Sequence, residues 1–127
     1  MSYKSSQVTI WTPSTTWNAN TTWTGHYNIY GKIFEGIANA AFTGAPDTGS
    51  LNITLPLRIT QLIPDSTGNG WDGSIVRGPW NCAFINATTV QIYYNTDATS
   101  MIAMSRTAPF TIANGHALTF IIRGILE

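Results

Sequence analysis

The chain has 127 residues, of which 9% are charged, far below the roughly 25% of an ordinary soluble domain. Six Lys and Arg balance six Asp and Glu, so the formal net charge is zero. The basic residues are scattered singly, which argues against a nucleic-acid groove. Copies with a neutral surface repel one another little, and association is favoured. This length is enough for one domain with its own core.

Cysteine content and hydropathy limit the cellular compartments in which we expect the protein. Cys82 is the single cysteine, so no intrachain disulfide can form, and the chain fits a reducing cytoplasm where it is made. No apolar run approaches the roughly 20 residues that cross a bilayer, and the first seven residues lack the apolar stretch of a secretion signal. We therefore expect no membrane partner and no export by that route.

The N-terminal segment 1–7 is polar and too poor in apolar residues to pack by itself. We expect it to form an arm that contacts a partner, followed by one domain over 8–127. The arm comprises Met1, Ser2, Tyr3, Lys4, Ser5, Ser6 and Gln7.

Residues 32–42 are the one stretch where helix and strand compete, because their apolar residues could also line a helical stripe. Gly36 and the β-rich neighbourhood favour a strand. That strand would be long and would carry small residues where another layer comes close. One face of it would present Phe34, Gly36, Ala38, Ala40 and Phe42.

Residues 50–55 alternate strictly, with Leu51, Ile53 and Leu55 on one face, and Pro56 closes the run. This pattern predicts a half-buried strand. Runs rich in β-branched and aromatic residues predict further strands at 73–77, 90–94 and 117–123. Clusters of Gly, Pro, Asn and Asp predict turns at 43–49, 64–70 and 113–115. The fold class we expect is all-β, an antiparallel β-sandwich or jelly roll.

Possible catalytic groups are few. Asp47-Thr48-Gly49 spells the motif of aspartic proteases, but Ala45-Pro46 precedes it where an apolar strand should stand, so we interpret it as a turn. Cys82 could act as a nucleophile with His26 or His116 as its base. Its apolar surroundings at 80–85 instead favour a small core residue. We expect no catalytic residues and no enzyme.

Metal binding has equally little support. The two histidines, the cysteine and the carboxylates do not show the spacing of metal ligands. Asp65, Asn69 and Asp72 lie in a Gly-rich segment that faintly resembles a calcium loop, but the ordered ligand pattern and its terminal Glu are missing. We expect a turn there, and neither a metal nor a cofactor.

The aromatic residues give the sharpest functional hint. Tryptophans stand at positions 11, 17, 23, 71 and 80. For Trp11 and Trp80 we expect packing in the core or between subunits. Trp23 and Trp71 are flanked by Thr, Gly and Asp, and we expect them to be exposed contacts for a sugar or a protein.

Three segments resemble, in their order and spacing, a small β-sandwich module of bacteriophage virion proteins. They are the opener Trp11-Thr12-Pro13, the Tyr-rich segment 25–36, and the segment 48–56 with its Gly-Ser-Leu-Asn-Ile-Thr-Leu-Pro ending. The resemblance covers most of the chain. It implies a trimeric module of the phage surface, which occurs at the tips of tail fibres and spikes and, as small stand-alone proteins, on capsids.

The resemblance and the uncharged composition together lead to one expected function. We expect a homotrimeric decoration or cement protein on the outer surface of the virion, made in the host cytoplasm, whose arm 1–7 contacts the major capsid protein. The alternative is the receptor-binding tip of a tail fibre, which would recognise a host surface glycan through Trp23 and Trp71. An enzyme is a distant third, since Glu35 and Glu127 are the only glutamates.

Overall fold

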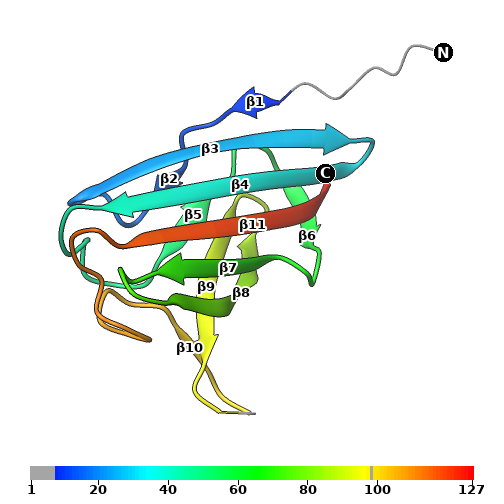
Figure 1. Cartoon of the computed structure of the whole chain (residues 1–127). Helices are drawn as coiled ribbons and strands as arrows, with labels where there is room; N and C mark the ends of the chain where they lie inside the picture. The colour runs from blue at the N-terminus through cyan, green and yellow to red at the C-terminus, as the bar shows by residue number, and fades with distance from the viewer. Residues whose placement is uncertain (1–7, 98) are drawn as a thin grey trace.

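The computed structural model describes residues 8–97 and 99–127, and the predicted arm 1–7 lies outside these residues. All regular elements of the described residues are strands (Figure 1), and none is a helix that could cross a membrane. The strands are β1 Thr9–Ile10, β2 Ser14–Thr15, β3 Thr21–Tyr30, β4 Ile33–Phe42, β5 Asn52–Thr54, β6 Ile59–Leu62, β7 Thr67–Trp71, β8 Val76–Asn86, β9 Thr89–Asn95, β10 Met101–Ala103 and β11 Ala117–Leu126.

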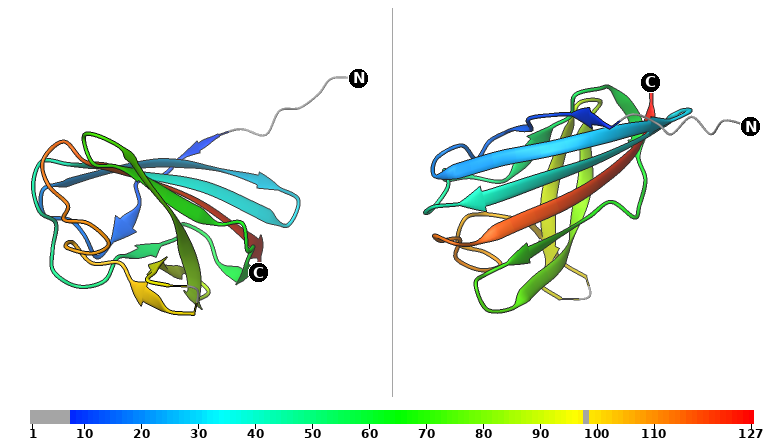
Figure 2. Two further views of the ribbon diagram at one scale, coloured as in Figure 1. Left: turned by 60° about the horizontal axis from the view of Figure 1, so that its bottom comes forward. Right: turned by 45° about the horizontal axis from the view of Figure 1, so that its top comes forward.

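These strands pair antiparallel within one sheet, in the order β1-β3-β4-β11-β7-β8-β9-β5-β2, with β10 added to β9 and β6 added to β11. The sheet curls so that β5 and β9 face the long strands β3, β4 and β11 (Figures 1 and 2). Register shifts occur where β8 pairs with β7 and with β9, and such irregularities bend a strand. The prediction of an all-β, antiparallel fold is confirmed, and the strands form one continuous curled sheet.

The first wall of the core confirms the strand interpretation of residues 32–42. β4 pairs along its whole length with β3 on one side and β11 on the other. Phe34, Ala38 and Phe42 are buried, as the predicted inward face requires, while Ile33 and Ile37 lie on the outer face. β11 alternates in the same way and buries Leu118, Phe120 and Ile122.

The second wall is built by β5 and β9. Leu51, Ile53 and Leu55 are buried, and Val90 and Ile92 of β9 are fully buried beside them. The half-buried strand predicted from the alternation at 50–55 is therefore confirmed. The regular strand is shorter than that pattern and spans only Asn52–Thr54.

The segment 64–70 was predicted as a turn, and this prediction is wrong for its second half. The chain turns at 64–65, and Thr67–Trp71 then forms β7 between β11 and β8. Gly68 and Gly70 face inward, and aromatic rings occupy the space that a larger side chain would need there. A Cβ on Gly68 would overlap the ring of Phe120, and one on Gly70 would lie 2.6 Å from Trp80.

The strand predicted at 73–77 is also only partly correct. Residues 73–75 form the bend that connects β7 to β8, and the new strand begins at Val76. The Asp72 carboxylate accepts hydrogen bonds from the backbone N–H groups of Ser74 and Ile75 at 3.0 and 2.9 Å. An Asp side chain that satisfies the N–H groups of the next residues favours a turn over a strand.

Candidate functional site

Trp23 is not the exposed contact that its Thr neighbours suggested. Its side chain is 8% exposed, its ring stacks on Phe120 with centroids 6.3 Å apart, and its indole N–H donates to the carbonyl of Trp17 at 2.7 Å. The alternation of β3 turns Trp23 inward and the flanking threonines outward. The prediction of exposure is therefore wrong for Trp23.

Trp71 is exposed, as predicted, with 44% of its surface open to solvent. It lies on the outer face of β7 and pairs in register with Ala117 of β11, a residue too small to cover the indole. A hollow of about 190 Å³ beside it is lined by Asn69, Gly70, Trp71, Ala117 and Thr119. This surface offers an aromatic ring with neutral amide and hydroxyl groups.

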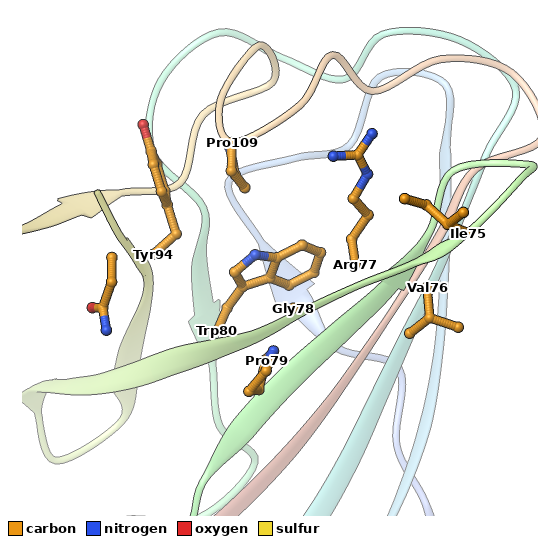
Figure 3. A pocket seen from close by; sticks show the side chains of 9 residues that line it. Ile75, Val76, Arg77, Gly78, Pro79, Trp80, Tyr94 and Pro109 are labelled. Carbon is orange, nitrogen blue, oxygen red and sulfur yellow. The ribbon is translucent and has the colours of Figure 1, made fainter. Parts of the chain in front are cut away.

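A larger hollow of about 410 Å³ lies where the β7–β8 hairpin approaches β9. Figure 3 shows Trp80 between Tyr94 on one side and Arg77 with Ile75 and Val76 on the other. The lining residues are Ile75, Val76, Arg77, Gly78, Pro79, Trp80, Tyr94, Asn95 and Pro109. They come from the bend before β8, from β8, from β9 and from the loop before β11, so the sequence does not place them together.

Arg77 is the charged side chain of this hollow, and two contacts hold it. Its Nε donates to the Asp72 carboxylate at 2.7 Å, and its guanidinium carbon lies 5.3 Å from the centroid of the Phe110 ring. Phe110 in turn stacks on Trp80, with centroids 5.9 Å apart and an angle of 18° between the rings. The guanidinium is thus positioned by an ion pair and by an aromatic stack.

The Asp72 carboxylate remains ionised when Arg77 is in place. Hydrogen bonds from the backbone N–H of Ile75, from the Arg77 side chain and from the backbone N–H of Ser74 lower the pKa of Asp72 to about 2. The anchor of Arg77 is therefore charged throughout the ordinary pH range.

The residues considered for nucleophilic catalysis are not brought together. Cys82 lies on β8 against the core, and burial raises the pKa of its thiol to about 12, so no reactive thiolate forms. His26 lies on β3, which β4, β11 and β7 separate from β8 within the sheet. His116 accepts a hydrogen bond from the backbone N–H of Ala113 through Nδ1, a contact within the turn that precedes β11.

Asp47 has a structural role. Its two carboxylate oxygens accept hydrogen bonds from the backbone N–H groups of Asn18 and Ala19, each at 3.2 Å. The Asp-Thr-Gly segment thereby joins two loops, in agreement with the predicted turn at 43–49.

The carboxylates of the supposed calcium loop each pair with an arginine. Asp65 lies 2.6 Å from Arg123 and Asp72 lies 2.7 Å from Arg77, while Asn69 belongs to the outer face of β7. Within residues 8–97 and 99–127, no group of three or more His, Cys, Asp and Glu side chains could hold a metal ion.

A row of three isoleucines and one histidine crosses the outer face of the sheet. The register places Ile10 beside His26, His26 beside Ile37, and Ile37 beside Ile121, across β1, β3, β4 and β11. We call these four residues the outer stripe. Ile10 is 81% exposed and Ile121 is 39% exposed, so the stripe presents large apolar side chains to solvent. The alternation of 32–42 indicated the outward position of Ile37, but pairing across four strands could not be read from the sequence.

The comparisons add no known relative to this description. No protein-family model matches the chain, and neither the search of curated proteins nor the search of solved structures found a significant match.

Proposed function

We propose that the protein is a structural subunit of a bacteriophage virion, a homotrimer that decorates the outer surface of the capsid and contacts the major capsid protein. The observation that carries the proposal is the outer stripe. Its isoleucines on β1, β4 and β11 include the exposed Ile10 and Ile121, and exposed apolar patches commonly mark interaction surfaces. The proposed trimeric state, β-sandwich fold and location on the capsid rest on the resemblance to small β-sandwich modules of phage virion proteins.

Association through this face has a simple energetic basis. Burying an exposed Ile side chain contributes about 1.5–3 kcal/mol before the entropic cost of association. The zero net charge leaves little repulsion between copies. On a capsid, many weak contacts repeated over one lattice would add avidity.

Ile121→Asp tests the interface. The wild-type protein should sediment at three times the 13.8 kDa mass of one chain, and the variant at the mass of one chain, because a desolvated unpaired carboxylate opposes burial of the stripe. Ile102→Asp is the matched control, since Ile102 is a similarly exposed Ile on β10, away from the stripe. A wild-type protein that stays monomeric at micromolar concentration contradicts the proposed trimer.

The second candidate is a receptor-binding tip that recognises host glycan, and the exposed indole of Trp71 favours it.

Deletion of residues 1–7 distinguishes the two proposed functions. A capsid decoration protein without its arm should remain a folded trimer but bind purified empty capsids more weakly. A receptor-binding tip should keep its binding to host cells after that deletion and lose it in Trp71→Ala. We expect the deletion to weaken capsid binding. Full capsid binding without the arm, together with binding to cells that depends on Trp71, would favour the receptor-binding tip over the decoration protein.

A further inference from the structure

The hollow between the β7–β8 hairpin and β9 collects hydrogen-bond donors without any acid among its lining residues. Arg77, Trp80, Tyr94 and Asn95 all carry N–H or O–H groups, and no Asp or Glu lines the hollow. The indole N–H of Trp80 and the Tyr94 hydroxyl form no hydrogen bond with other residues of the described ranges. Such a lining suits a ligand rich in acceptors.

Arg77 presents the part of its guanidinium that recognises a carboxylate. Asp72 occupies Nε and Phe110 covers one face, which leaves both terminal Nη groups without a hydrogen bond among the described residues. Two parallel N–H groups match the two oxygens of a carboxylate. Asp72 offsets most of the positive charge of the guanidinium. Recognition of a carboxylate therefore depends on the parallel arrangement of the two Nη groups of Arg77 more than on net charge.

The remaining walls of the hollow are apolar. Ile75 and Pro109 lie on the side of β8 from which the Arg77 side chain projects, and Val76 and Pro79 complete the lining (Figure 3). The volume of about 410 Å³ lies within the range of about 300–1,000 Å³ that small-molecule sites occupy. The ligand that fits therefore has a carboxylate, further polar groups and an apolar face.

We propose that this hollow binds a carboxylated sugar, a ligand that the assembly role proposed above does not require. The carboxylate pairs with the Nη groups of Arg77, the sugar hydroxyls accept hydrogen bonds from Tyr94 and Trp80, and the C–H face of the ring packs on Ile75 and Pro109. A purely apolar acid would satisfy Arg77 but leave the other polar groups desolvated without partners, which is unfavourable.

Calorimetric titration with sodium glucuronate tests the proposal, with glucose as the matched neutral sugar. The two probes share a ring and hydroxyl pattern and differ at the carboxylate. We expect glucuronate to bind on the order of tenfold to a hundredfold more tightly, the range that a charge-assisted hydrogen bond supplies.

Three variants assign the binding to the hollow. Arg77→Lys keeps the positive charge but removes the paired N–H groups of the guanidinium, and should weaken glucuronate binding about tenfold. Tyr94→Phe removes only a hydroxyl, and should weaken binding of both sugars by about fivefold. Arg58→Lys is the control, since Arg58 pairs with Glu127 and does not line the hollow, and binding should not change.

Equal binding of glucuronate and glucose, or unchanged binding in both Arg77→Lys and Tyr94→Phe, overturns the proposal. Binding of benzoate without binding of glucuronate overturns the assignment to a sugar. Thermal unfolding of each variant is measured alongside, so that loss of fold is separated from loss of the site, and Tyr94→Phe keeps the test decisive if Arg77→Lys unfolds.

Discussion

Ile53→Ala should lower the free energy of unfolding by about 2–5 kcal/mol, the usual cost of truncating a buried aliphatic side chain to Ala. Ile53 is fully buried at the centre of β5, and its strand neighbours on both sides are hydrogen-bonded in register. The lost methyl and methylene groups leave a cavity that the paired strands cannot collapse to fill. Urea denaturation followed by tryptophan fluorescence measures the change.

Asn52→Ala is the matched control one residue away. Asn52 lies on the opposite face of β5, and its side-chain oxygen is buried without a hydrogen-bond partner among the described residues, so its removal deletes no such interaction. We expect a far smaller loss than for Ile53→Ala. Equal losses would mean that β5 is buried on both faces, as it would be between subunits.

Gly68→Ala should be the second strongly destabilising change, by about 3 kcal/mol, the upper end of the cost of overpacking. The added Cβ would overlap the ring of Phe120, which is fully buried and stacked on Trp23. The ring has no free space into which to move, so either β7 shifts away from β11 or the aromatic stack is lost. The loss of stability is measured by the same urea titration.

The control for this change is Gly44→Ala, in the loop after β4. There the added Cβ would lie 3.2 Å from the exposed Asn20 side chain, whose Nδ2 donates to the Ala45 carbonyl at 2.9 Å, so at most one exposed hydrogen bond is disturbed and the loss should be smaller than for Gly68→Ala. Phe120→Leu in the Gly68→Ala background should recover part of the lost stability, because the smaller side chain frees the overlapped volume. A Gly68→Ala variant as stable as the wild-type protein would contradict the packing described here.

Local sequence patterns were sufficient to predict four of the eleven strands of the described residues, β4, β5, β9 and β11. Residues 32–42, 50–55, 90–94 and 117–123 are strand residues or directly flank a strand, and the buried faces of the first two are those predicted. Alternation succeeds because neighbouring side chains of a strand point to opposite faces, a property of the chain itself. The turn at 113–115 was predicted for a similar reason, since Gly115 has a positive φ that suits glycine.

The same local argument failed wherever a distant residue decided the outcome. In β7 the alternation of Gly68, Asn69, Gly70 and Trp71 turns the glycines inward and the tryptophan outward, the reverse of what hydrophobicity favours. Phe120 and Trp80 cause this reversal, because their rings fill the interior at that point. Neither residue is a sequence neighbour of β7, so the local pattern predicted a turn over 64–70 where Thr67–Trp71 forms a strand.

The sequence by itself determined the all-β class, the absence of an intrachain disulfide, and the formal net charge of zero. Those properties depend on composition and on the two-residue period of a strand. Only the tertiary structure decided the burial of Trp23, the outer stripe and the hollow around Arg77. Each of these joins residues from strands far apart in the chain, and their meeting depends on the pairing order and curl of the sheet.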